Sequence, residues 1–216
     1  KKIKGRVPEY GKYVFCNKGT QPVMQSLRIA REKKKKNIII SVTGSWHGST
    51  SELLYTNNSK LEIIELSSGL DFNFKKNLKF IPYNDVKRSE IILNKYKKQI
   101  MCVIIEPIQG CLPVDAKKYL TFLNNYCKKN KLLLIFDEMI TGLRFNCSSV
   151  QSQFKLKPSI STFGKCFGGG LPIGIIGIKK DIVKKLERKK KKIFFGGTFS
   201  GNSISLGNIN VLYSLS

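Results

Sequence analysis

The chain has 216 residues, a formal net charge of +25 and 41% hydrophobic residues. This length fits one domain or two small ones, and the apolar content is high enough for a core, which excludes a disordered chain. The charge alone would favour a nucleic-acid binder. However, lysine supplies 33 of the 39 basic residues, whereas phosphate and base recognition favours arginine, so we expect no nucleic-acid partner.

In chain order, amphipathic segments alternate with continuous apolar runs. The first helix is expected at Pro22–Lys36, with Thr20 placed to cap it. Continuous apolar runs are typical of strands buried on both faces of a parallel sheet, so the alternation predicts an α/β layered domain. The lysine runs 33–36 and 189–192 are expected to end two helices, where cations meet the negative helix pole. The other predicted elements are strands at Asn37–Thr43, Ile100–Glu106, Lys131–Asp137 and Pro172–Gly177, and helices at Ala116–Asn130 and Lys180–Lys191.

The rarer residues exclude further classes of site. His47 is the only histidine, so a metal site with several histidines is excluded. The cysteines form no C-x-x-C pair, and several lie in apolar runs, which predicts buried free thiols in a reducing cytoplasm. No apolar stretch is long enough to cross a membrane, and residues 1–5 lack the apolar core of a signal peptide. The cysteines are Cys16, Cys102, Cys111, Cys127, Cys147 and Cys166.

Two of the predicted strands end in carboxylates, Glu106 and Asp137. Ligands of open α/β sheets bind beyond the carboxyl ends of the strands, where these side chains should emerge. Because acidic residues are seldom fully buried unless they are paired, each is expected to have a cationic or ligand partner. A purely structural bond to a neighbouring loop is the alternative for either residue.

Four further segments complete a candidate ligand site. Lys165 precedes the glycine run 168–170, and Asn17-Lys18-Gly19-Thr20 precedes the first predicted helix, whose free amides would bind an anion. The segment 196–202 offers more backbone amides and hydroxyls for a phosphate, and the loop Trp46-His47-Gly48 offers a ring for stacking. A phosphate cradle, a stacking ring, a carboxylate and an amine are the groups needed to hold pyridoxal 5'-phosphate (PLP) as a Schiff base.

The sequence resembles the class III, fold-type I PLP-dependent aminotransferases, and within them the glutamate-1-semialdehyde 2,1-aminomutase branch. The resemblance runs from Phe15 to Asn202, with four motifs in family order. The family pattern F-D-E-V-M-T-G-F-R reads F-D-E-M-I-T-G-L-R at 136–144. G-K-x-x-G-G-G-x-P-x-G is intact at 164–174, G-T-x-S-G-N at 197–202 and P-Y-N-D at 82–85.

The resemblance implies the large PLP-binding domain of the aspartate aminotransferase-like fold, with a mostly parallel central sheet flanked by helices. Residues 1–216 would be part of that domain, and the family's N-terminal segment and C-terminal small domain would lie outside it. Both ends are expected to be cut points in a longer chain, because residue 1 is not Met and residue 216 lies in an apolar stretch.

The resemblance also implies roles for individual residues. Lys165 would form the Schiff base and move the substrate proton, and Asp137 would keep the pyridine nitrogen protonated. Trp46 would stack on the ring where the family usually has Tyr. Thr198 would reach the phosphate from the neighbouring subunit, so we expect a homodimer with a shared active site. The phosphate would also be bound by Lys18, Gly19 and Thr20, and Glu106 and His47 would lie on the substrate side.

Departures from the family pattern affect the phosphate cradle and the branch. N-S-G-T-E-A reads N-K-G-T-Q-P at 17–22, so Lys18 replaces a hydroxyl, although an ammonium also suits a phosphate. Ile140 stands where ordinary class III ω-aminotransferases carry Gln and the aminomutases carry Met, and this favours the aminomutase branch. Residues 107–111 fit neither branch.

Three functions therefore compete. The first is PLP-dependent amino-group transfer on a small molecule, as a glutamate-1-semialdehyde aminomutase that forms 5-aminolevulinate or as a transaminase that uses a 2-oxo acid and amino acid pair. The second is a non-catalytic basic protein that binds phosphate or nucleic acid. The third is a fragment that is inactive without the rest of the family fold.

Overall fold

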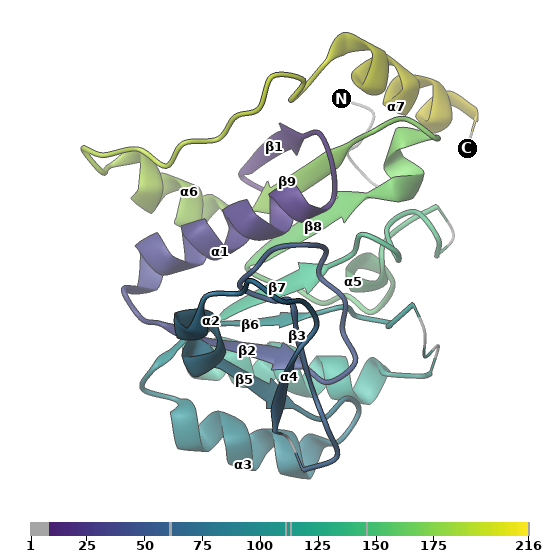
Figure 1. The fold of residues 1–216 in the computed structure, drawn as a ribbon. Coiled ribbons are helices and arrows are strands. Elements are labelled where there is room, and N and C mark those ends of the chain that lie inside the picture. The colour runs from purple at the N-terminus through teal and green to yellow at the C-terminus, as the bar shows by residue number, and fades with distance from the viewer. Residues whose placement is uncertain (1–8, 61, 111, 113, 146, 216) are drawn as a thin grey trace.

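The apolar runs assemble into one seven-stranded sheet in a computed structural model, which describes residues 9–60, 62–110, 112, 114–145 and 147–215 (Figure 1). The strand order is β1-β9-β8-β7-β6-β2-β5, and the five strands from β8 to β5 in this order run parallel to one another. The strands of the sheet are β1 (Lys12–Cys16), β2 (Ile38–Val42), β5 (Leu78–Ile81), β6 (Ile100–Ile105), β7 (Leu133–Asp137), β8 (Ile160–Gly164) and β9 (Gly174–Ile178); β3 (Tyr55–Asn57) and β4 (Ile63–Glu65) form a separate pair.

Helices cover both faces of this sheet. Successive residues of one strand enter different cores: Ile39 packs with Leu27 of α1, whereas Ile40 packs with Leu120 of α4. This alternation explains why the strands read as continuous apolar runs, since both faces are covered. The helices are α1 (Thr20–Lys34), α2 (Phe72–Asn77) and α6 (Lys180–Glu187) on the first face, and α3 (Val86–Tyr96), α4 (Lys117–Lys129), α5 (Val150–Gln153) and α7 (Ser203–Leu215) on the second, with a 3-10 turn, η1 (Lys165–Gly168), after β8.

The predicted fold class, a mostly parallel α/β sheet flanked by helices, is confirmed, but the direction predicted for one strand is wrong. The run Pro172–Gly177 was expected to be parallel, whereas β9 pairs antiparallel with both β8 and β1. Only residues 165–173 link β8 to β9, and a parallel crossover needs about a dozen residues or more. A continuous apolar run thus reports burial on both faces, and the length of the connection decides the direction.

Two expectations about helix ends are corrected. Thr20 is the first residue of α1 and not its cap, because the helix begins two residues before the predicted start; Gly19 is the N-cap, with no side-chain capping bond. The lysine run 33–36 spans the end of α1, but α6 ends at Glu187, so the run 189–192 follows the helix instead of ending it.

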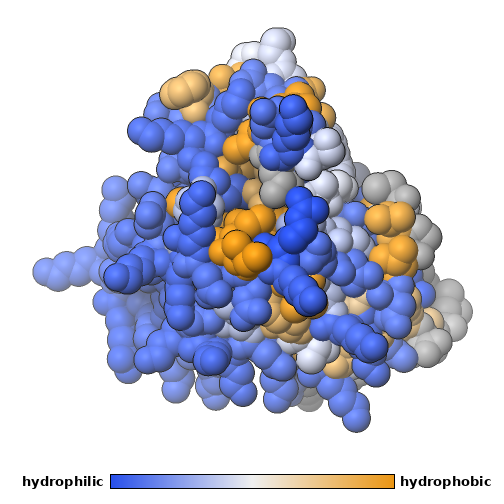
Figure 2. Space-filling model, turned by 90° about the horizontal axis from the view of Figure 1, so that it is seen from below, coloured by the Kyte–Doolittle hydropathy of each residue, from blue (hydrophilic) through white to orange (hydrophobic). Residues whose placement is uncertain are grey.

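Cysteine burial and surface polarity agree with the sequence. Cys16, Cys102 and Cys127 are buried free thiols, whereas Cys147 is exposed and Cys166 is half-buried. Cys111 and residues 1–8 lie outside the described residues. The face seen in Figure 2 is covered mostly by hydrophilic residues with small hydrophobic patches between them. Within the described part of the chain, no helix is long and apolar enough to cross a membrane.

Replacing Lys35 with glycine is expected to raise the free energy of unfolding by about 1 kcal/mol, because a side chain in the left-handed region costs that much relative to glycine. Lys35 follows α1 with φ 54° and ψ 37°. A urea titration measures the change. Lys36→Gly is the matched control, since Lys36 is not among the residues with positive φ and should not be stabilised. Equal effects of both substitutions would show that loss of charge is responsible.

Candidate active site

Asp137 ends β7 at the carboxyl edge of the sheet and is 3% exposed. One carboxylate oxygen, Oδ2, lies 2.8 Å from His47 Nδ1. The other, Oδ1, accepts a 2.8 Å hydrogen bond from Thr162 Oγ1 of the neighbouring strand β8. The carboxylate is therefore held in a fixed orientation by partners from two other segments, as a buried charge requires.

His47 leaves one polar atom without a partner. The ring is 3% exposed, and its Nε2 makes no hydrogen bond within the described residues, although Nδ1 pairs with Asp137. A buried polar atom without a partner is costly unless a ligand or water supplies the missing bond. Asn17 Oδ1, in the segment before α1, is a second such atom.

Glu106 follows β6 and holds the loop that carries Trp46. It is 4% exposed, and its Oε2 accepts a 2.7 Å hydrogen bond from the backbone N–H of Trp46. Burial raises the pKa of the Glu106 carboxyl, while the Trp46 hydrogen bond and the charges of His47 and Lys165 lower it. Lys165 directly follows β8, two strands from β6 in the sheet, so it lies at the same sheet edge as Glu106.

Lys165 is exposed and begins the 3-10 turn η1 directly after β8. Its φ is 45°, a left-handed conformation that a residue with a side chain seldom adopts and that is often found at functional sites. The preceding Gly164 has no room for a side chain, since a Cβ there would lie 2.3 Å from Met139 Sδ. A Cβ on Gly19 would lie 3.0 Å from the same sulfur, so Met139 packs between the lysine motif and the start of α1.

The start of α1 contacts the loop that carries Trp46 and His47, and we refer to these two segments together as the cup. Ser49 N donates a 3.3 Å hydrogen bond to Thr20 Oγ1, and a Cβ on Gly48 would lie 2.6 Å from that oxygen. Because Gly19 provides no side-chain cap, the first N–H groups of the helix have no capping side chain and suit an anion. Lys18 directly precedes Gly19 and is exposed, and Trp46, which precedes His47 in the loop, is 54% exposed.

Thr198 is exposed, in a segment that lies beside the cup of its own chain. A Cβ on Gly197 would lie 2.9 Å from Gln21 Nε2 and 2.9 Å from Ser200 Oγ. The structure of one chain thus places the segment 197–200 next to the first turn of α1. Its predicted contact with a partner's phosphate stays a prediction.

Sequence reasoning missed several residues that hold the site together. Thr162 fixes Asp137, and its position opposite Asp137 in the β7–β8 register becomes visible only once β8 is recognised. Gln109 donates from Nε2 to Thr43 O (2.7 Å) and Ser45 Oγ (3.1 Å), which fixes the backbone before Trp46. Glu138 is fully buried, and its oxygens accept hydrogen bonds from Val150 N and Gln151 N.

Comparison with known proteins now decides the family. A profile of the class-III aminotransferases matches residues 1–212. The chain belongs to this family. It is 35% identical over 209 residues to the glutamate-1-semialdehyde 2,1-aminomutase of Methanosphaera stadtmanae, covering 95% of this chain and 49% of the relative. It is 39% identical to the protein of that name from Wigglesworthia glossinidia brevipalpis, covering 93% and 47%.

Solved structures agree on the fold of this class-III aminotransferase chain. An omega-transaminase from Sphaerobacter thermophilus superposes with a TM-score of 0.88 at 22% identity, covering all of this chain and 52% of that one. A glutamate-1-semialdehyde aminomutase (K286A) from Pseudomonas aeruginosa in complex with PMP gives 0.78 at 18% identity, covering 94% and 47%. The chain thus spans about half the length of the curated relatives it matches.

The predicted cofactor agrees with membership of the class-III aminotransferases, and one solved transaminase of the same fold has PLP bound. The residues present here fit that group. Asp137 is a fixed carboxylate, His47 Nε2 and Asn17 Oδ1 are buried atoms without partners, and α1 begins without a side-chain cap. No group of three or more His, Cys, Asp or Glu that could hold a metal ion occurs among the described residues.

Gly48→Ala is expected to weaken PLP binding about 10-fold or more, because a Cβ 2.6 Å from Thr20 Oγ1 forces the binding loop to move, at a cost on the order of 1–2 kcal/mol. The added Cβ would press against Thr20 Oγ1. Fluorescence titration with PLP measures the effect. Gly69→Ala is the matched control, since Gly69 has the same φ of 76° as Gly48 and no atom within 4 Å of its Cβ position. Weaker binding in both variants would contradict the role of the Thr20 contact.

Proposed function

We propose that this protein transfers an amino group with PLP, as a glutamate-1-semialdehyde 2,1-aminomutase that forms 5-aminolevulinate for tetrapyrrole synthesis. The observation that carries the proposal is the meeting of Asp137, His47, Glu106 and Lys165 at one sheet edge beside an uncapped helix start. Relatives of that name that are 35% and 39% identical over most of the chain support the choice of reaction. Ile140 supports it too, since an apolar residue replaces the Gln usual in ω-aminotransferases.

When PLP is bound, its electron-withdrawing ring would stabilise negative charge on the substrate carbon. Asp137 would hold a proton at the pyridine nitrogen, since its carboxylate is fixed by Thr162 and His47. Lys165 Nζ would carry the covalent link and move the proton between the two carbons of the substrate. Glu106 keeps the Trp46 backbone in place, and the exposed Trp46 ring would cover one face of the cofactor.

The phosphate would lie at the start of α1. The uncapped N–H groups after Gly19, the Thr20 hydroxyl and the Lys18 ammonium would bind it, and the helix dipole adds to the attraction. We propose a homodimer in which Thr198 of each subunit completes the cradle of its partner. Residues 1–216 would then be part of the large domain of a cytoplasmic enzyme.

Substrate conversion without an acceptor tests the reaction. The protein, in the complete form that contains this chain and loaded with the amine form of the cofactor, is given glutamate-1-semialdehyde without any 2-oxo acid. Formation of 5-aminolevulinate is the expected result. Strict dependence on an added 2-oxo acid would instead assign the transaminase reaction, and no amino-group transfer with either mixture would leave a phosphate-binding or inactive protein.

A further inference from the structure

A cavity lies at the opposite end of the sheet from Lys165. Its volume is about 350 Å³. It opens where β7 and β8 begin, whereas Asp137 and Lys165 lie where these strands end. The cavity is lined by Asn124, Asn125, Cys127, Lys128, Leu132, Leu134, Lys155, Lys157, Ser159 and Lys179.

Four lysines from separate parts of the chain converge on this cavity, and none of the residues that line it is acidic. Lys128 comes from α4, Lys155 and Lys157 from the segment between α5 and β8, and Lys179 from the junction of β9 with α6. Lys179 is half-buried, and burial lowers the pKa of its ammonium. The positive charges of Lys157 and Lys128 lower this pKa further, whereas the negative charge of Asp181 raises it. The cluster thus carries a net positive charge, with four lysines on the wall against the single neighbouring carboxylate of Asp181.

Hydrogen bonds fix the backbone around the cavity and one of its four ammonium groups, that of Lys179. Lys179 Nζ donates to Lys157 O at 2.5 Å, and Lys157 N donates to Asn124 Oδ1 at 3.1 Å. Ser159 Oγ accepts from Leu134 N at 3.2 Å, which ties the wall to β7. A charged ligand would therefore meet a wall whose backbone is already ordered, which lowers the entropic cost of binding.

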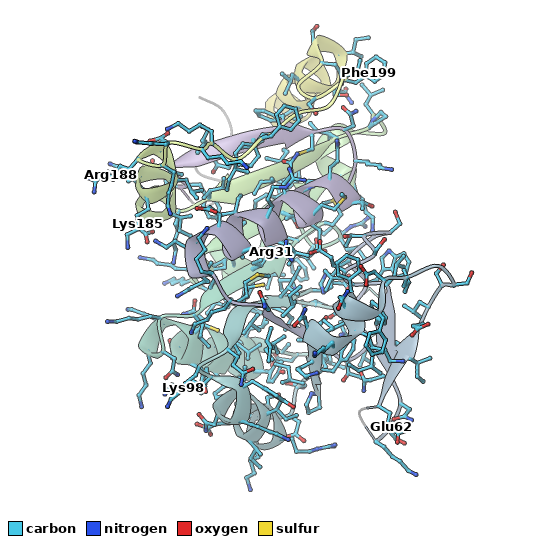
Figure 3. All side chains as sticks on the ribbon, turned by 60° about the vertical axis from the view of Figure 1, so that its left-hand side comes forward. Arg31, Glu62, Lys98, Lys185, Arg188 and Phe199 are labelled. Carbon is cyan, nitrogen blue, oxygen red and sulfur yellow. The ribbon has the colours of Figure 1, made fainter. Side chains whose placement is uncertain are left out.

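A second basic groove on the molecule shows the contrast. It lies between α1 and the segment after α6, where Lys185 and Arg188 stand close to α1 (Figure 3). There Glu32 pairs with Lys35 at 2.7 Å and with Lys189 at 3.2 Å, and Arg31 pairs with Glu52. Its lysines are partly neutralised within the protein, unlike those of the cavity.

We propose that the cavity at the start of β7 and β8 binds a small polyvalent phosphate, of the diphosphate class. Lysine ammonium groups bind phosphate as point charges, and several of them match an anion with several charges. The apolar floor of Cys127, Leu132 and Leu134 strengthens the attraction, because it keeps water from one side of the ligand. The volume holds more than a single phosphate group. This site is separate from the PLP site and does not depend on the proposed reaction.

Calorimetric titration with inorganic diphosphate tests the site in the complete, PLP-saturated protein at 0.15 M salt. Wild type is expected to bind one diphosphate per chain at this site. The double variant Lys128→Gln/Lys157→Gln, whose side chains are both exposed, should bind at least about 10-fold more weakly, since it loses two charged hydrogen-bond donors. Lys35→Gln/Lys189→Gln removes the same charge from the partly neutralised groove and should bind within about twofold of wild type.

Three results would overturn the proposal. Equal weakening in both double variants would show that only the overall charge attracts the anion. Absence of saturable binding to wild type would show that the cavity is not a site. Binding that occurs only without PLP would place diphosphate in the cup at α1. The PLP absorbance of each variant is recorded in parallel, so that a failure of the cofactor site is distinguished from a failure of this one.

Discussion

Lys165→Ala is expected to lower substrate turnover by at least about 10⁴-fold, the upper range for loss of a positioned proton-transfer group. The variant should also lose the visible absorbance band that wild type gives with PLP and that borohydride removes. Both effects have one cause, because the amine of Lys165 is proposed both to hold the cofactor and to move the proton. Stopped assays for turnover and an absorption spectrum for the band provide independent measurements.

The matched control for this experiment is Lys131→Ala. Lys131 is exposed and has a φ of 53°, close to the 45° of Lys165, so both substitutions remove one charge from a left-handed residue. Lys131 precedes β7, at the other end of that strand from Asp137. Its replacement should leave the absorbance band and the turnover unchanged. A borohydride-sensitive band that survives in Lys165→Ala would refute the assignment of the lysine.

Glu138→Ala is expected to lower the free energy of unfolding by about 3 kcal/mol or more, since each buried donor left without an acceptor costs about 1–3 kcal/mol. Three groups lose their acceptor. Val150 N lies 2.7 Å and Thr141 Oγ1 2.9 Å from Glu138 Oε2, and Gln151 N lies 3.0 Å from Oε1. Chemical denaturation measures the loss, and Glu65→Ala, at an exposed site, is the control.

Glu138 also predicts a pH dependence. Burial raises the pKa of its carboxyl above the ordinary value of 4.5, and the hydrogen bonds only partly oppose this. A carboxyl whose pKa is raised in the folded state adds to the free energy of unfolding. This contribution is fully present below pH 4.5, and it is lost as the pH rises through the folded-state pKa. The stability of wild type relative to Glu138→Gln should therefore fall as the pH rises above 4.5. A constant difference across this range would contradict the raised pKa.

Much of the parallel core could be predicted from the sequence. The runs that form β2, β6 and β7 are apolar throughout, and every residue of these strands is buried. β8 was missed because polar Ser161 and Thr162 interrupt its apolar residues, yet both are fully buried. Their hydroxyls have partners inside the fold, Gln151 and Asp137, which local sequence cannot reveal.

The residue types of the candidate site could be predicted from the sequence, but the hydrogen bonds that hold these residues in place could not. Motifs point to Asp137 and Lys165 as candidates. The contact of His47 Nδ1 with Asp137, 90 positions further along the chain, depends on the whole segment between them folding correctly. Gln109 lies in the segment 107–111, which fits neither the aminomutase nor the ω-aminotransferase pattern. The sequence therefore did not show that its amide fixes the loop before Trp46. Such supports are long-range hydrogen bonds, so only the three-dimensional structure shows them.

The pairing of β1 with β9 affects the order in which this chain can fold. Lys12 lies opposite Ile178 and Cys16 opposite Gly174, so among the residues that the structure describes β1 has one neighbouring strand, which follows more than 150 residues later. At about 5–20 residues per second, a ribosome needs about 10–30 s to make the residues between them. During that time Val14 and Phe15 stay without their partner strand. The outer sheet edge therefore closes late, and binding by a chaperone would protect this segment of the nascent chain.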